Sequence, residues 1–187
     1  MPRKQSITLH QINDAAFALV KESGIAQLTA RKLAAKAGCS TQPIFRVYPN
    51  MEECKKTVYL RAIEAYEQFY DQFPKRQNVA FVNLGLAYIR FAATEKNLFD
   101  LLFLNAERKA LGQGKGFYEI LNGSQGNVIW EIQKARVDGC KNPEQMFMKM
   151  WIFIHGVACM TITGDYDLDT QETITLLEEL YRAFLRE

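Results

Sequence analysis

The sequence predicts an all-α protein with two parts: an N-terminal three-helix domain over residues 1–50 and a larger helical domain over residues 51–187. Three observations predict this: helix-start signals crowd the first fifty residues, apolar residues recur at three- and four-residue steps beyond them, and no pair of strands is indicated. About nine helices are expected. The 187 residues, 48% of them apolar, suffice for one or two packed domains.

The first expected helix begins at a capping box. Thr8 is its N-cap, Gln11 is the partner of that cap, and Ile7 with Ile12 forms a hydrophobic staple. Gly24 is expected to end the helix.

Two short helices separated by a glycine turn follow. Thr29 opens the first helix, and Gly38 supplies a residue that tolerates positive φ. Ser40 is expected to cap the second helix through the amide of Gln42. This is helix-turn-helix spacing, with the motif at residues 29–48, and it would present the N-terminal side chains of the second helix to a DNA major groove.

Several features of the first sixty residues follow one another in a family-specific order. They are a helix ending in glycine, a Thr-opened helix with alanine before a glycine turn, a Ser-opened helix with an aromatic ending, and a polar-capped fourth helix: Ser23-Gly24, Leu28-Thr29, Leu33-Ala34, Ala37-Gly38, Ser40, Ile44-Phe45, Tyr48 and 50–53. In this order they resemble the N-terminal domain of the tetracycline-repressor (TetR) family of bacterial transcription regulators. The resemblance implies a repressor that binds a pseudo-palindromic double-stranded DNA operator as a homodimer and is released by a small-molecule effector.

Three positions depart from that family pattern. The family usually has Tyr, His and Lys where Phe45, Val47 and Met51 stand, and those residues commonly contact phosphates. Their loss would remove contacts that fix register and supply salt-dependent affinity. The alternative therefore stays open that the chain is an all-helical ligand-binding or adaptor protein with weakened or lost DNA binding.

The expected DNA contacts fall into two groups. Thr41, Gln42 and Arg46 are expected at base edges. The remaining candidates concern the DNA backbone: Thr29, Arg31, Ser40, Phe45 (by its family position), Tyr48, Lys55 and Lys56. Charge agrees with this placement, because residues 1–61 hold ten Lys and Arg against four Asp and Glu, while the net charge of the chain is only +2.

Amphipathic helices are expected throughout the second part. The fourth helix runs from Met51 to about Phe73, and the others are expected at 77–95, 97–110, 124–138, 144–163 and 170–186. The glycine-rich stretch between residues 112 and 126 is expected to be a flexible connection. It lacks the GK[ST] ending of a phosphate loop, and no strand precedes it.

The last two helices each carry more than one apolar stripe. In the first of them one stripe contains Phe147 and Met150, and a second contains Met148, Ile152 and Cys159. A single core cannot bury both stripes, so these helices predict a homodimer interface. The residues assigned to it are Trp151, Ile154, Ala158, Leu177, Leu180, Tyr181 and Phe184.

Aromatic residues in the second part suggest a pocket for a small apolar or amphipathic effector, as the resemblance implies, although most of them are expected to be core. The nominated effector-binding residues are Tyr88, Phe103, Trp130, Trp151 and His155.

Other classes of protein are poorly supported. No nucleophile–base arrangement or acidic cluster suggests an enzyme, and two histidines with four scattered cysteines predict neither a metal site nor a cofactor. The cysteines form no C-x-x-C pair, and no signal peptide is evident. The apolar run Met150–Ile162 is too short to span a bilayer. A cytoplasmic location without a membrane partner is therefore expected.

Overall fold

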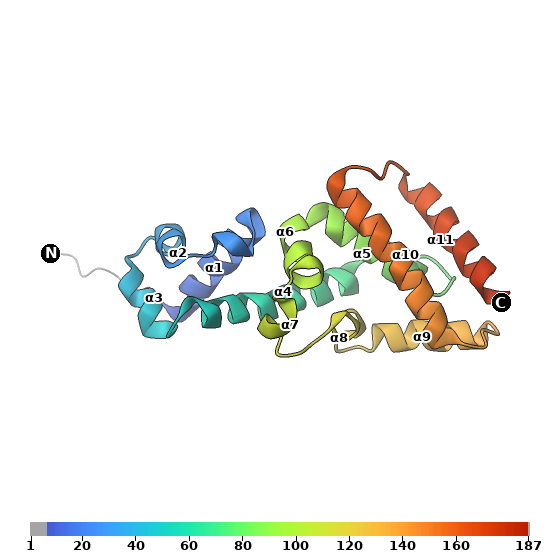
Figure 1. Cartoon of the computed structure of the whole chain (residues 1–187), viewed down its shortest axis with the longest axis horizontal. Coiled ribbons are helices and arrows are strands. Elements are labelled where there is room, and N and C mark those ends of the chain that lie inside the picture. Colours follow the sequence, from blue (N-terminus) through green and yellow to red (C-terminus); the bar gives the residue numbers. More distant parts are fainter. Residues whose placement is uncertain (1–6, 187) are drawn as a thin grey trace. The chain divides into compact units, whose positions relative to one another are not determined.

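The computed structural model describes residues 7–186 of the chain, and within them it contains eleven α-helices, two short helical turns and no strand (Figure 1). The predicted all-α fold is confirmed. The chain forms two compact units, residues up to Ala65 with Asn97–Gly116, and Tyr66–Lys96 with the residues from Phe117 onward. The boundary between the units falls within one helix, α4 (Met51–Gln72).

The first unit contains the helix-turn-helix. Its elements are α1 (Leu9–Ser23), the 3-10 turn η1 (Ile25–Gln27), α2 (Ala30–Ala37), α3 (Thr41–Val47), the start of α4, most of α6 (Lys96–Phe99), the π-helical turn η2 (Asp100–Leu104) and α7 (Arg108–Leu111). Helix α2 packs against both α1 and α3. The fully buried side chains of Ile12, Leu33 and Ile44 come from these three helices. Burial of this small core fixes which faces of α2 and α3 remain exposed.

Local capping signals account for most helix starts. The Thr8–Gln11 capping box is present, the Thr29 hydroxyl accepts the Lys32 amide at 3.3 Å, and the Asn50 side chain accepts the Glu53 amide at 3.0 Å. The expected Ser40 cap is wrong, because the Ser40 side chain makes no capping hydrogen bond. Gly38 has φ +67°, the left-handed conformation that glycine adopts without strain.

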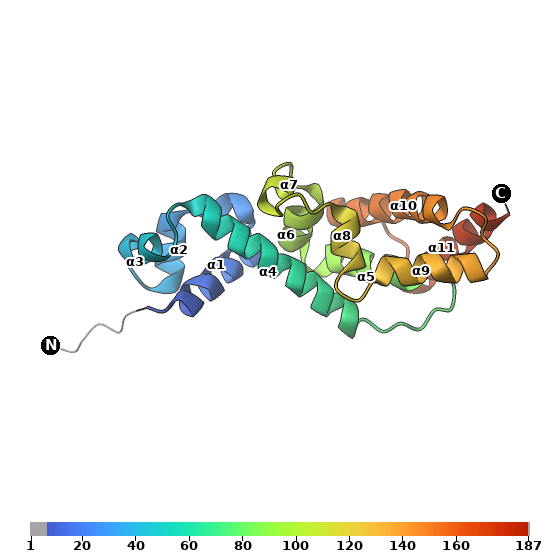
Figure 2. The ribbon, with the colours of Figure 1, turned by 90° about the horizontal axis from the view of Figure 1, so that it is seen from below.

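The second unit is built around α10 (Pro143–Thr163), which packs against α5 (Val82–Thr94), α9 (Asn127–Val137) and α11 (Thr170–Leu185) (Figure 2). Helix α11 begins with a capping box of Asp169 and Glu172. Helix α10 is 21 residues long, and by length and composition it is the one described helix that could cross a membrane. The sequence-based expectation concerned only the apolar run Met150–Ile162, which is too short to span a bilayer, but α10 extends beyond that run. Part of its apolar character is explained by burial against its three neighbours.

Two stretches differ from the predicted helix boundaries. The helix expected at 97–110 is interrupted, forming α6, η2 and α7 in turn. The glycine-rich stretch expected to be a flexible connection contains α8 (Phe117–Asn122), which packs against α9. Ile120 and Leu121 are each only 1% exposed. Burial of these two side chains stabilises a short helix that the flanking glycines disfavour.

A buried carboxylate supports the entry into α5. The backbone amide of Phe81 donates to Glu131 Oε2 at 2.7 Å, and Phe81 has φ +66°, an uncommon conformation for a bulky residue. Burial raises the pKa of Glu131, and the hydrogen bond from Phe81 together with the Lys134 charge lowers it by less. The hydrogen bond to Glu131 thus stabilises a strained turn, although burial of the carboxylate costs desolvation free energy.

The substitution Glu131→Gln should make stability less dependent on pH. A carboxyl whose folded-state pKa is raised stabilises the fold fully below its ordinary pKa of 4.5, and this contribution is lost as pH rises through the raised value. The free energy of unfolding of the wild type should therefore fall over that window. That of the variant should not, because the neutral Gln side chain can still accept the Phe81 amide. Urea unfolding between about pH 4 and pH 8 measures this difference. Parallel pH profiles for the two proteins would contradict the role given to Glu131.

Candidate functional site

Helix α3 is held by its inner face and presents its outer face to solvent. Ile44 is fully buried, whereas Gln42 and Arg46 are exposed and Thr41 is half-buried. Phe45 is 51% exposed, a large apolar surface for a helix with so small a core behind it. The structure thus brings the expected base-reading residues together on one short helix that is anchored by its opposite side.

Hydroxyls near the two helix starts differ in availability. The Thr29 hydroxyl caps α2, while the exposed Ser40 hydroxyl is not used to cap α3. Arg31, in the first turn of α2, is also exposed. Ser40 is consequently available to an external acceptor such as a phosphate oxygen, although the capping role that first singled it out is absent.

Tyr48 lies in the core rather than at the surface. Its side chain is only 6% exposed, and its hydroxyl donates to the side chain of Asn13 on α1. Burial raises its pKa, the largest of several effects at this residue. Tyr48 therefore fixes the end of α3 against α1, and its hydroxyl is directed inward.

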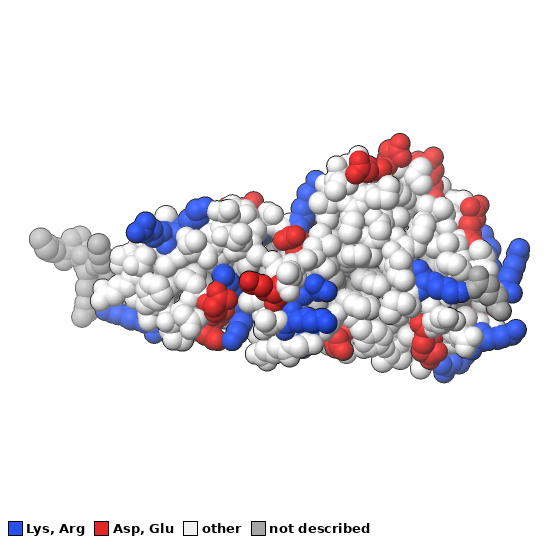
Figure 3. Space-filling model, viewed as in Figure 1, with Lys and Arg blue, Asp and Glu red and all other residues white. Residues whose placement is uncertain are grey.

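Some basic side chains of the first unit form ion pairs within the chain, and others do not. Lys55 and Lys56 form ion pairs within α4, with Glu52 and Glu53 respectively, each at 2.7 Å. Exposed pairs of this kind contribute little to stability, so the ammonium groups can exchange partners at low cost. Arg31 and Arg46, by contrast, form no hydrogen bond or ion pair through their side chains with any residue of the described chain. Basic side chains lie over α2 and below α3 in Figure 3, and acidic ones accompany the basic ones at the start of α4.

Sequence reasoning missed two further cations on α2. Lys32 and Lys36 are exposed one helical turn apart, and Lys36 pairs with Glu22 of α1 at 2.6 Å. Their four-residue spacing was the available signal. Of the ten basic residues counted in the first 61, Arg3 and Lys4 lie outside the described residues.

No family model matches the sequence, and no curated protein matches it. Solved structures do. A TetR-like transcriptional regulator from Rhodococcus sp. RHA1 superposes with a TM-score of 0.68 over 100% of this chain and 98% of its own, at 15% identity. A putative TetR family regulator from Vibrio parahaemolyticus gives a TM-score of 0.61 at 18% identity, covering 93% of this chain and 96% of its own.

The chain has a TetR-like fold. The similarity of fold extends along the whole chain, whereas the resemblance in sequence was confined to the first sixty residues. In this TetR-like fold, α3 is the second helix of the helix-turn-helix, and α10 and α11 are the last two helices.

Three of the five nominated effector residues meet in the second unit. The Tyr88 hydroxyl and His155 Nδ1 are 2.9 Å apart, and Trp151 lies against both rings, with centroid distances of 4.6 Å to Tyr88 and 5.6 Å to His155. Phe117 stacks on Trp151 at 5.1 Å. The cluster is filled by its own side chains, because the gap next to Trp151 holds only about 10 Å³.

The other two nominees lie elsewhere. Trp130 is 69% exposed on α9. Phe103 belongs to the first unit, where its ring packs on Phe99 at 5.1 Å. Neither residue joins the cluster around Trp151.

The two apolar stripes of α10 have opposite environments. Most of the residues assigned to a dimer interface are buried within the chain itself: Trp151, Ile154, Ala158, Leu177 and Tyr181. Leu180 and Phe184 are half-buried. The exposed stripe of α10 instead contains Met148 at 42%, Ile152 at 66% and Met160 at 44% exposure, at four- and eight-residue steps. The buried stripe serves the core, and the exposed one is the surface available to a partner.

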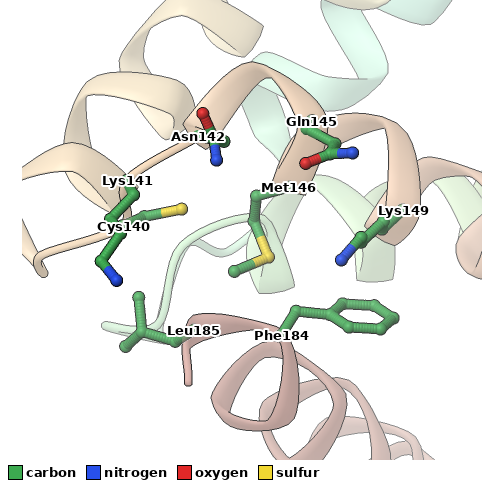
Figure 4. A pocket seen from close by; sticks show the side chains of 8 residues that line it. All are labelled: Cys140, Lys141, Asn142, Gln145, Met146, Lys149, Phe184 and Leu185. Carbon is green, nitrogen blue, oxygen red and sulfur yellow. The ribbon is translucent and has the colours of Figure 1, made fainter. Parts of the chain in front are cut away.

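A small pocket lies where the start of α10 meets the end of α11 (Figure 4). It measures about 90 Å³, and Met146 lies between the Cys140–Lys141 segment and Lys149. The Lys149 ammonium sits 4.9 Å from the centre of the Phe184 ring. A cavity of this size is well below the range of typical small-molecule sites.

Proposed function

We propose that the chain is a sequence-specific DNA-binding transcription regulator, acting as a repressor that a small-molecule effector releases from its operator. The observation that carries the proposal is α3, which presents Gln42 and Arg46 outward from a helix-turn-helix within a TetR-like fold. The Rhodococcus protein described above is a TetR-like transcriptional regulator, and the Vibrio protein is a putative TetR family regulator. A cytoplasmic location and the absence of catalysis are part of the same proposal.

In this proposal the first unit docks through α3. Gln42 and Arg46 read base edges, with Thr41 beside them, because an amide or a guanidinium can make paired hydrogen bonds to a base. Arg31, Ser40, Lys55 and Lys56 contact the DNA backbone, supported by the Thr29 end of α2. The unpaired guanidinium groups of Arg31 and Arg46 favour an anionic partner because no carboxylate in the described chain neutralises them.

The proposed regulator is a homodimer whose interface is the exposed stripe of α10 together with the half-buried residues of α11. Met148, Ile152 and Met160 are apolar and exposed. Gly156 between them is also exposed, and a Cβ there would meet no atom within 4 Å apart from its chain neighbours and the backbone of its own helix. A glycine on such a stripe permits close approach of a second helix. A dimer can place two α3 helices in half-sites about 34 Å apart, which one helix alone cannot read.

Two substitutions should separate base reading from backbone contact. Gln42→Ala should weaken binding to the operator by about 1–3 kcal/mol, while its binding to random DNA stays unchanged. Lys55→Ala should weaken binding to all DNA sequences and reduce the salt slope by about one unit. Fluorescence anisotropy with labelled operator and scrambled duplexes over a salt series measures both effects. If Gln42→Ala binds both the operator and the scrambled duplex with the same affinities as the wild type, the docking arrangement is wrong.

The alternative function is a ligand-binding or adaptor protein that has lost DNA binding. Phe45 favours it, because this exposed residue lacks the hydroxyl that the family usually places there. The wild-type arm of the same experiment distinguishes the two functions: an adaptor binds neither duplex at low salt, whereas a regulator binds both and prefers one.

Release by an effector requires reciprocal coupling. An effector that reduces operator affinity by about 5- to 150-fold, a coupling of 1–3 kcal/mol, must itself bind more weakly in the presence of operator DNA by the same factor. Titrating the effector with and without operator tests this relation.

A further inference from the structure

A cavity of the second unit lies away from the Trp151 cluster. It measures about 440 Å³ and is bordered by the end of α4, one face of α5, the end of α10 and the start of α11. This volume lies within the range of ligand-binding pockets, roughly 300–1,000 Å³. Its apolar lining comes from Phe73, Leu86, Ile89, Ala93 and Leu168.

Three of the four hydroxyl groups that line this cavity already donate hydrogen bonds, and the fourth, on exposed Thr170, forms none with residues 7–186. Thr161 donates to the carbonyl of Val157 at 2.9 Å, and Thr173 donates to the carbonyl of Asp169 at 2.7 Å. Because the Thr173 proton is used there, the Tyr166 hydroxyl is the donor in its 3.0 Å bond to Thr173. These three groups can therefore offer a ligand little more than acceptor lone pairs.

Among the described residues that line the cavity, Arg90 is the one that carries a charge. It is exposed, and its guanidinium forms no hydrogen bond or ion pair with any residue among 7–186. Three aspartates flank the lining residues of the α10–α11 connection: Asp165 accepts the Thr163 hydroxyl at 2.6 Å, Asp169 accepts the Glu172 amide at 2.8 Å, and Asp167 is exposed. None of these aspartates lines the cavity. An unpaired cation with five donors beside apolar walls matches a ligand with one anionic end and one apolar body.

We infer that this cavity binds amphipathic monocarboxylates, with the carboxylate on Arg90 and the apolar tail against Phe73, Leu86 and Leu168. A guanidinium holds a carboxylate through two parallel hydrogen bonds, and burial of the tail removes apolar surface from water. The identification of this ligand as the effector rests on the proposed regulatory function, whereas the binding itself does not.

Isothermal titration calorimetry of the full chain with sodium decanoate, below its micellar concentration, tests the site. The wild type should bind one decanoate per chain saturably, and the neutral amide decanamide should bind at least about tenfold more weakly. Arg90→Gln should weaken decanoate binding by the same factor. Arg182→Gln is the matched control, since Arg182 is another exposed arginine of the second unit that pairs with Glu178 outside the cavity, and its variant should bind as the wild type does.

A second variant locates the ligand independently of charge. Ala93→Phe fills the cavity from the half-exposed surface of α5 and should abolish decanoate binding while the circular dichroism spectrum stays unchanged. Absence of saturable decanoate binding to the wild type would overturn the inference. So would equal binding by Arg90→Gln, or full binding by a folded Ala93→Phe protein.

Operator binding provides the distinguishing arm. If decanoate binds in the predicted manner but leaves operator affinity unchanged, the carboxylate site stands and its role as the effector site fails. If the chain binds no DNA at all, the proposed regulator is wrong, and the calorimetric result still decides the site.

Discussion

Replacing Ile152 by Asp should convert the proposed dimer into a folded monomer. Ile152 is 66% exposed within the chain and lies midway along the exposed stripe of α10. The substitution therefore costs the single chain little, whereas in a two-fold interface it buries two unpaired carboxylates, which is strongly unfavourable. Sedimentation equilibrium should show the loss of the dimer, and operator affinity should fall with it because one helix-turn-helix reads too few base pairs.

Trp130→Asp is the matched control for this prediction. Trp130 is 69% exposed on α9 and is not part of the proposed interface, so its variant should sediment as the wild type does. Leu177→Asp should behave differently from both, because Leu177 is fully buried within the chain and a carboxylate there should unfold the second unit. A dimeric Ile152→Asp protein would reject the exposed stripe as the interface.

Gly85→Val should destabilise the second unit by about 1–3 kcal/mol, because it overpacks the contact of α5 with α10 and α11. A Cβ at Gly85 would lie 2.8 Å from Ile154 Cδ1, 3.0 Å from Ile154 Cγ1 and 3.3 Å from Leu177 Cδ1. Ile154 is 3% exposed and Leu177 is fully buried, so neither side chain can move aside freely. Urea unfolding measures the loss as a lower transition midpoint.

Gly156→Val provides the comparison, since a Cβ at this helical glycine meets nothing within 4 Å. Both substitutions replace a helical glycine by the same residue, so their difference isolates the steric term. The pair is best measured in the Ile152→Asp background, where a dimer cannot alter the result. Equal midpoints for the two variants would contradict the close packing at Gly85.

Local signals predicted much of the fold. The caps at Thr8, Thr29, Asn50 and Asp169 could be predicted because each involves a side chain and an amide three residues later. The outward face of α3 followed from the same short-range pattern. A short helix such as α8 was missed because its stability comes from the burial of Ile120 and Leu121, which depends on the rest of the unit.

Roles that depend on distant partners were less accessible. Tyr48 was assigned to the DNA backbone, but its hydroxyl meets Asn13, which is 35 residues away in the sequence. The two stripes of α10 were recognised, yet the choice of the buried stripe depends on α5 approaching through Gly85. Arg90 was not singled out, because its significance appears only when the cavity beside it is known.

Footprinting of the DNA upstream of the gene is the measurement that tests the central proposal most directly. A dimeric regulator should protect two half-sites related by two-fold symmetry, with centres about one helical turn, or a multiple of it, apart. Gln42→Ala should relax the base preference of the protein at equivalent positions of both half-sites. Uniform cleavage of the whole upstream region at low salt, by a protein that is folded and dimeric, would contradict the account.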